Sequence, residues 1–325
     1  METLINNTAL IRRRIRDTNL TVKAYSVGTQ SHTDIAVIYM ENKVDKQLLA
    51  NLDKRLKAID VPSLTMNQQS LVEALYKNLW YNPFPKVKHT ERPDTTASAI
   101  LDGNIVILVD NAPSALLLPT SIFDVLEEAD DYYFPPVTGT YLKLARYFIT
   151  IVTVLITPLW LLALQNSDYC PEFFRFVLLD EPQNIPVFWQ LILMEVGIDG
   201  LRLAALNTPN SLTTPLSIIG AIALSEFAVE SGWVSMEAIL YMALVTVANF
   251  TQPNFELGYS FKFCRVLLLV LTYIFNVWGF IIAFIINLVL LCTNRTLSSK
   301  SYLYPLVPFN GKEFLRKILR IRNPR

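Results

Sequence analysis

Residues 147–167 read YFITIVTVLITPLWLLALQNS, a run of 21 residues without a charged side chain. At about 1.5 Å per residue, a helix of this length crosses a hydrocarbon core of about 30 Å. The run therefore predicts a membrane-spanning helix. It separates a charged region before it from a mainly apolar region after it.

The charged residues divide the chain into three parts. Residues 1–146 carry 16 Lys and Arg and 17 Asp and Glu, which is typical of a soluble domain. Residues 147–292 carry only 4 Lys and Arg and 10 Asp and Glu, and residues 293–325 carry 8 Lys and Arg and one Glu. With 52% hydrophobic residues and a mean hydropathy of +0.34, the chain is too apolar for a soluble protein and too charged for a membrane bundle alone.

The first part has the pattern of a mixed α/β domain. We expect residues 1–19 to form a linker and the start of a helix, and residues 20–140 to form a soluble, cytoplasmic α/β domain. Within it the pattern predicts strands at 20–28 and 33–41, helices at 45–60 and 68–77, and an antiparallel strand pair at 104–111 and 114–120.

The second part, residues 141–294, is expected to be an α-helical, multi-pass membrane domain. Its apolar runs predict four spans, at about 147–166, 212–231, 235–252 and 266–292. The last uncharged run has 29 residues, which is longer than one perpendicular crossing. It is either a long helix bent around Asn276–Gly279 or a tight re-entrant pair.

The basic residues predict the orientation of these spans. Lys143 and Arg146 precede the first span and a basic cytoplasmic tail, residues 295–325, follows the last. Both termini are therefore expected in the cytoplasm, which requires an even number of crossings. With four crossings, residues 186–206 do not span the membrane and form an amphipathic or re-entrant segment.

Three charged residues stand in that otherwise apolar segment. Glu195, Asp199 and Arg202 are spaced i, i+4 and i+7, so they share one side of a helix. Such a stripe can line or gate an aqueous pore, or pair with charges on a neighbouring subunit. Two simpler interpretations remain open: the stripe faces water at the membrane surface, or Arg202 neutralises Asp199 along its own helix.

Two further acidic residues, Glu226 and Glu230, lie one helical turn apart near a membrane boundary. Facing a pore, they would favour cations. At a helix end, they can equally reach headgroup water. We include both as candidate pore or gate residues.

The C-terminal tail has the pattern of a basic amphipathic helix over residues 312–325. Its cations are candidate contacts to anionic lipid, although contact with the soluble domain is an alternative. These candidates are Lys312, Arg316, Lys317, Arg320 and Arg322.

Catalytic and cofactor motifs are absent from the sequence. It contains no Gly-rich phosphate loop, and its two histidines, His32 and His89, have no nearby Cys or His in a metal-binding spacing. We expect no enzyme activity, cofactor, metal site or nucleic-acid partner.

Six segments together resemble a known family. They are NTALIRRRIRD (7–17), YSVGTQSHTDIAVIYM (25–40), NPFPKVKHTERPD (82–94), ILDGNIVILVDNAPSALLLPT (100–120), FWQLILMEVGIDGLRLAA (188–205) and YLYPLVPF (302–309). In combination they resemble the GerA family, the A subunits of bacterial spore germinant receptors. The resemblance implies that the soluble part corresponds to the second of two N-terminal subdomains, and that the first is missing here.

The resemblance also implies a function. It predicts a multi-pass protein of the spore inner membrane, acting in germination as a homo-oligomeric ion-release channel with other germination membrane subunits. A non-conducting scaffold or signalling subunit of the germination complex is one alternative. A secondary transporter is another, although the sequence shows no internal symmetry between two halves.

Overall fold

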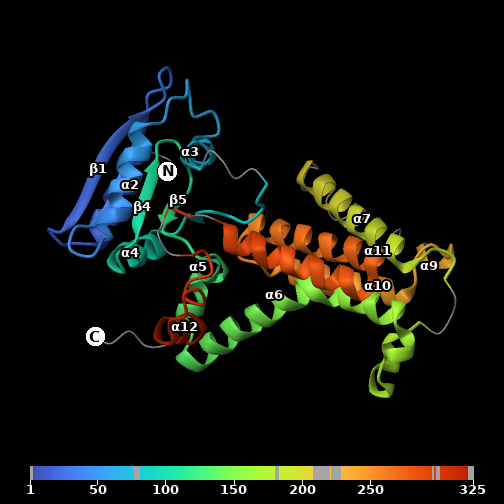
Figure 1. The fold of residues 1–325 in the computed structure, drawn as a ribbon. Helices are drawn as coiled ribbons and strands as arrows, with labels where there is room; N and C mark the ends of the chain where they lie inside the picture. The colour runs from blue at the N-terminus through green and yellow to red at the C-terminus, as the bar shows by residue number, and fades with distance from the viewer. Residues whose placement is uncertain are drawn as a thin grey trace. The chain divides into compact units, whose positions relative to one another are not determined.

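The computed structural model describes residues 3–76, 81–179, 183–207, 220, 228–294, 296–297 and 301–320. The chain forms two compact units (Figure 1). The α/β unit comprises Met1–Lys143 and Leu290–Arg325, and the helical unit comprises Leu144–Val289. The described part of the basic tail thus belongs to the α/β unit, in line with the alternative that the tail contacts the soluble domain.

The α/β unit is built on a five-stranded antiparallel sheet with the order β1-β2-β4-β5-β3. The strands are β1 (Leu20–Val27), β2 (Thr33–Met40), β3 (Lys88–Thr90), β4 (Ile105–Val109) and β5 (Ala115–Leu118). The predicted pairing of β4 with β5 is confirmed, with Ile105 opposite Leu118 and Val106 opposite Leu117. The strands predicted from residue 20 and from residue 33 are confirmed as β1 and β2.

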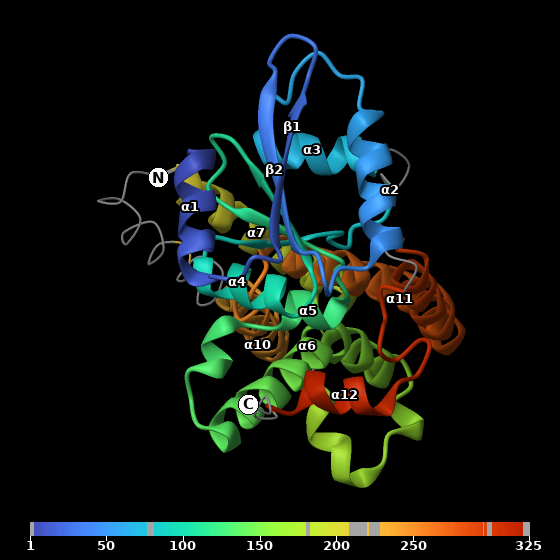
Figure 2. The ribbon, with the colours of Figure 1, turned by 90° about the vertical axis from the view of Figure 1, so that its left-hand side faces the viewer.

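Helices cover both faces of this sheet, which explains why the central strands are apolar throughout. Side chains alternate between the two faces of a strand. On β2, Ile35, Val37 and Tyr39 join a core formed with α2 (Lys46–Lys57) and α3 (Asn67–Leu75). Ala36, Ile38 and Met40 join a second core with α1 (Leu4–Arg14) and α4 (Pro93–Leu101). Figure 2 shows the sheet between α1 and α2.

The sequence reasoning missed α4 and β3. Helix α4 begins with Pro93, and Asp94 follows in the first turn. Both residue types at these positions are helix-start signals. Pro is well tolerated there because the first helical N–H groups have no partner in the helix. The short helices α5 (Ile122–Leu126) and η1 (Ala129–Tyr132) then lead to α6 (Pro136–Gln165).

The helical unit contains the remainder of α6 and most of the later elements. These are η2 (Ser167–Tyr169), η3 (Glu172–Val177), α7 (Val187–Asn207), α9 (Ala228–Glu230), α10 (Met236–Phe250) and α11 (Phe255–Thr293). A buried core of Trp160 from α6, Leu191 from α7, Met242 from α10 and Leu269 from α11 joins the four long helices. The span expected at 212–231 lies almost wholly outside the described residues.

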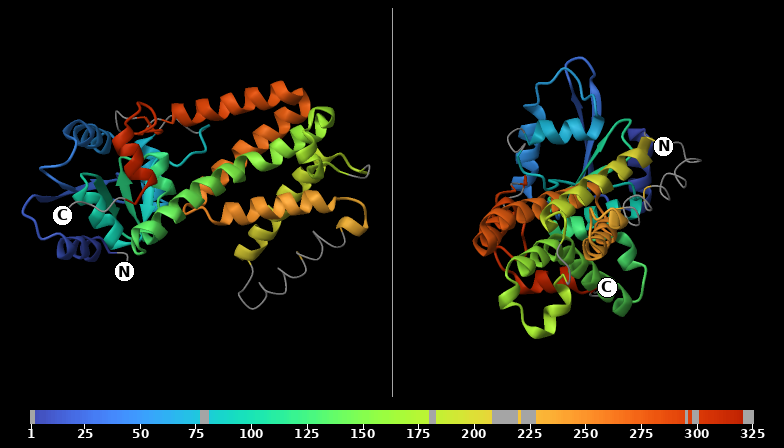
Figure 3. Two further views of the ribbon diagram at one scale, coloured as in Figure 1. Left: turned by 90° about the horizontal axis from the view of Figure 1, so that it is seen from below. Right: turned by 90° about the vertical axis from the view of Figure 1, so that its right-hand side faces the viewer.

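Helix α11 is a hairpin of two antiparallel arms, Phe255–Phe275 and Val277–Thr293. Asn276 breaks the helix with φ 54° and ψ −132°. The Asn287 side chain in the second arm donates a hydrogen bond of 3.1 Å to the carbonyl of Cys264 in the first. Figure 3 shows the two arms side by side. Of the two forms expected for this run, a bent long helix or a tight pair, the structure has the pair, while the number of membrane crossings stays a prediction.

The reversal at Asn276 is fixed by close packing and by a side-chain amide pair. Gly279 lies so near the first arm that a β-carbon there would meet the Leu271 carbonyl oxygen at 1.8 Å. Asn166, just after α6, exchanges two hydrogen bonds with the Asn276 amide, at 2.6 and 3.1 Å. A left-handed φ is unfavourable for a residue other than glycine, and Asn tolerates it best.

Two described helices are long and apolar enough to cross a membrane by length and composition. They are α6 and α11, in which an 18-residue stretch has a mean hydropathy of 2.2 and 2.5, respectively. Helix α10 is apolar but has only 15 residues.

Candidate functional site

The charged stripe of α7 lies against the first arm of α11. Glu195 is only 4% exposed. Its Oε1 accepts from Arg265, with Nε at 2.6 Å and Nη2 at 2.5 Å. Its Oε2 lies 3.1 Å from Nζ of Lys262. One buried carboxylate therefore faces two cations.

Lys262 joins the two acidic residues of α7. Its Nζ lies 2.5 Å from Oδ2 of Asp199, which is partly exposed, and also donates to the backbone carbonyl of Glu195 at 3.1 Å. Glu195, Asp199, Lys262 and Arg265 thus form a cluster with no net formal charge, which we call the α7–α11 charge cluster. Mutual neutralisation is what permits four charges in an apolar interior.

Arg265 also ties this cluster to α6. Its Nη1 donates to the backbone carbonyl of Thr153 at 2.8 Å, and both residues are buried. A guanidinium group can make these contacts together because its donors are fixed in one plane. The charge cluster therefore connects three helices of the helical unit.

For Arg202 the structure contradicts one of the simpler interpretations of the stripe, and the pore or gate role stays a prediction. Lys262, rather than Arg202, is the partner of Asp199. The Arg202 guanidinium lies 4.0 Å from the ring centre of Phe255, 5.0 Å from that of Phe250 and 5.1 Å from that of Tyr259. These cation–π contacts attach the end of α7 to α10 and α11.

Of the other two candidate pore residues the structure describes only Glu230, which does not contact this cluster. Glu230 is exposed at the end of α9. Glu226 lies outside the described residues. The sequence reasoning missed Lys262 and Arg265, although a signal was present. They are two of only four Lys and Arg between residues 147 and 292, and they lie one helical turn apart.

The tail forms a helix that is shorter than predicted, α12 (Gly311–Ile318), and the candidate cations of the tail divide into two sets. Lys317 pairs with Asp124 and lies 3.6 Å from Glu127, and the Arg320 backbone N–H donates to Thr140 at 3.1 Å. Contact with the soluble part, the alternative in the sequence reasoning, thus holds for Lys317 and Arg320. Lys312 and Arg316 remain exposed, and Arg322 lies outside the described residues.

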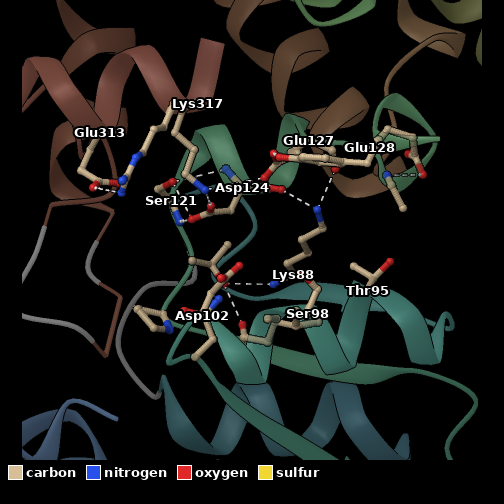
Figure 4. A pocket seen from close by; sticks show the side chains of 18 of the residues that line it. Lys88, Thr95, Ser98, Asp102, Ser121, Asp124, Glu127, Glu128, Glu313 and Lys317 are labelled. Carbon is tan, nitrogen blue, oxygen red and sulfur yellow. Dashed lines mark hydrogen bonds and ion pairs between the residues drawn. The ribbon is translucent and has the colours of Figure 1, made fainter. Parts of the chain in front are cut away.

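Lys317 borders a polar cavity of about 770 Å³ in the α/β unit (Figure 4). The cavity lies between α4, α5 and α12, and six carboxylates but only three cations line it. Lys88 lies at its wall and donates to the carbonyls of Asp124 and Glu127 at 2.7 Å each. Burial lowers the pKa of this lysine. In the described part of the chain, no group of three or more His, Cys, Asp or Glu could hold a metal ion.

Glu127 is the centre of the contacts beside this cavity. Its Oε1 accepts from the buried Lys143 of α6 at 2.8 Å, and the Tyr132 hydroxyl also donates to it. Burial alone would raise the pKa of Glu127, but the nearby ammonium groups of Lys317 and Lys143 outweigh burial and lower this pKa to about 2.

Acid is therefore expected to destabilise the α/β unit through Glu127. A carboxyl with a pKa of 4.5 unfolded and about 2 folded stabilises above pH 4.5, and this stabilisation is lost as the pH falls from 4.5 to 2. The contribution is roughly 3 kcal/mol. Unfolding followed by near-ultraviolet circular dichroism should show a loss of stability in this window that Glu127→Gln lacks. Glu128→Gln is the matched control, and parallel pH curves for wild type and Glu127→Gln would contradict the assignment.

The whole chain is similar to spore germination proteins. The model of the Bacillus/Clostridium GerA spore germination protein family matches residues 1–325. The chain is 37% identical over 324 residues to Stage V sporulation protein AF of Bacillus subtilis (strain 168), covering 100% of this chain and 65% of that protein. It is 28% identical over 324 residues to Spore germination protein A1 of the same organism, covering 99% and 67%.

The chain is also similar to a third germination protein and to one crystal structure. Spore germination protein KA of Bacillus subtilis (strain 168) is 27% identical over 98% of this chain and 59% of its own length. The chain thus spans between 59% and 67% of the length of these three relatives. The crystal structure of the N-terminal domain of the A subunit of the Bacillus megaterium spore germinant receptor GerK3 aligns with 36% of this chain and 91% of that domain, at 32% identity and a TM-score of 0.29.

Proposed function

Since the chain belongs to the GerA family of spore germination proteins, we propose that it is a non-enzymatic membrane subunit of a spore germination complex. In this proposal it assembles with copies of itself and with other germination subunits in the spore inner membrane. The assembly forms a channel that releases ions. The observation that carries the channel proposal is the α7–α11 charge cluster, because charged residues among apolar helices are rare and typically mark functional sites.

The cluster suits a closed state. Its two carboxylates are neutralised by Lys262 and Arg265, so they offer no free charge to a passing ion. Displacement of α7 along α11 would separate these pairs and expose Glu195 and Asp199 to an aqueous path. A germination signal then acts by shifting the population from the paired to the separated arrangement.

The arrangement of the chain supports termini on one side of the membrane. The α/β unit is formed by residues up to Lys143, in the first turns of α6, and by residues from Leu290, near the end of α11, so the chain leaves this unit and returns to it. An even number of crossings between Leu144 and Val289 satisfies this condition. In the proposal, the α/β unit and both termini are cytoplasmic.

Ion leakage from liposomes tests the channel proposal. Full-length protein is reconstituted in liposomes loaded with potassium and sodium, and efflux is compared for wild type, Glu195→Gln and Asp199→Asn. Weakening the closed-state pairs by about 1.4 kcal/mol raises the open-to-closed ratio about tenfold, so efflux should rise in both variants. Glu172→Gln, in exposed η3, is the matched control. Efflux equal to wild type in both variants would refute the gating role.

A non-conducting scaffold is the second candidate. The internal neutrality of the charge cluster favours it, because a purely structural cluster needs no change of state. Retention of germination after residues 147–292 are replaced by an unrelated membrane anchor would support the scaffold and exclude the channel.

A further inference from the structure

Helix α12 presents two different faces. Its inner face holds it on the α/β unit: the Phe314 ring packs edge-on against Phe123, with ring centres 6.1 Å apart, and Lys317 pairs with Asp124. Its outer face carries Lys312, Leu315 and Arg316, at the i, i+3 and i+4 spacing that places side chains on one side of a helix. All three are exposed. Arg316 also borders the cavity between α4, α5 and α12.

The exposed face is apolar as well as basic. Leu315 is 51% exposed, and the preceding loop exposes Phe309 at 71% and Val307 at 50%. Residues 311–325 contain six Lys and Arg and a single Glu, Glu313, which pairs with Arg316 at 2.9 Å. This combination of apolar side chains and excess positive charge is complementary to the surface of an anionic bilayer.

The position of α12 along the chain fits the same partner. The Arg320 backbone binds Thr140 in the second turn of α6, and the Arg320 side chain donates to the Tyr132 carbonyl. Tyr147, where the uncharged part of α6 begins, follows Thr140 by seven residues, or about 10 Å of helix. The tail is therefore attached within two helical turns of the first apolar run.

We propose that the outer face of α12, together with Val307 and Phe309, is a docking surface for anionic lipid headgroups. Lys312 and Arg316 contact the lipid phosphates, and the exposed apolar side chains enter the headgroup layer. Lys317 and Arg320 act differently, because they hold the helix to the α/β unit. This inference rests on the proposed membrane location, but it requires no channel activity.

An environment-sensitive probe on the outer face tests the proposal. The native Cys170, Cys264 and Cys292 are replaced by serine, and a nitrobenzoxadiazole fluorophore is attached at Leu315→Cys. The full-length protein is placed in nanodiscs of phosphatidylcholine, with or without phosphatidylglycerol. We expect a blue shift and protection from an aqueous quencher only with phosphatidylglycerol. High salt should reverse both effects.

Charge variants and a matched probe complete the design. The double variant Lys312→Gln with Arg316→Gln should lower the ratio of docked to free probe about tenfold or more. As a control, the same probe attached at the exposed position Leu101→Cys should not respond to lipid. A probe at residue 315 that stays in water in anionic nanodiscs overturns the proposal. Protection that rises with protein concentration in detergent also overturns it, in favour of a second copy. Docking without ion efflux would leave this inference standing while refuting the channel.

Discussion

Replacing Arg265 by methionine will lower the free energy of unfolding of the helical unit by about 3–5 kcal/mol, the range found when one partner of a buried ion pair is removed. The Glu195 carboxylate would stay buried with Lys262 as its remaining cation, and Thr153 would lose a donor. Methionine keeps much of the side-chain volume, so the loss reports on charge and hydrogen bonding. Chemical denaturation of the protein in detergent measures the effect.

A control and a double variant separate charge pairing from a general loss of packing. Arg175→Met, at an exposed position in η3, should change the stability by less than about 0.5 kcal/mol. Glu195→Met combined with Arg265→Met should be less destabilised than the sum of the two single variants, because no uncompensated charge remains at that pair. Additive effects would mean that the two side chains do not stabilise each other.

Gly279→Ala is expected to prevent the α11 hairpin from closing normally. The added β-carbon would lie 1.8 Å from the Leu271 carbonyl oxygen, so the two arms must separate. We expect a loss of about 3 kcal/mol or more, as for severe overpacking. Crosslinking of native Cys264 to Asn287→Cys with a short bifunctional thiol reagent should report the closed hairpin and decrease in the variant.

Gly200→Ala provides the matched comparison. Among the described residues, and apart from the backbone of its own helix, no atom lies within 4 Å of a β-carbon added at Gly200. Alanine is favoured over glycine inside a helix by up to about 1 kcal/mol, so this variant should be neutral or more stable. Equal effects of the two substitutions would show that close contact between the arms does not fix the hairpin.

The elements of the α/β unit were largely predictable, because their signals are local. The β4–β5 pair follows from two apolar runs around a turn, and α2 from leucines at helical spacing. The inclusion of residues from Leu290 onward in the α/β unit was not predictable from local patterns. Tyr302 accepts a backbone hydrogen bond from Ile122, at a separation in sequence that no periodic pattern reveals.

Of the candidate site, the acidic residues on α7 were predictable from the sequence, but their cationic partners on α11 were not. The spacing of Glu195 and Asp199 placed them on one side of α7 from sequence alone. Their partners could not be assigned, because Glu195 and Arg265 are 70 residues apart and either could have faced water. The reversal at Asn276 was also uncertain, because an asparagine within an apolar run is compatible with a continuous bent helix or with a turn.

The division of the α/β unit into two stretches of chain has a consequence for biosynthesis. All five strands lie before residue 119, so the sheet can fold while the helical unit is still being translated. Lys143 can meet Glu127 at that stage, but Lys317 emerges 174 residues after Lys143. At bacterial translation rates this is a delay of roughly ten seconds to half a minute. The contact of α12 with Asp124 and Glu127 is thus made only after the apolar helices have been synthesised.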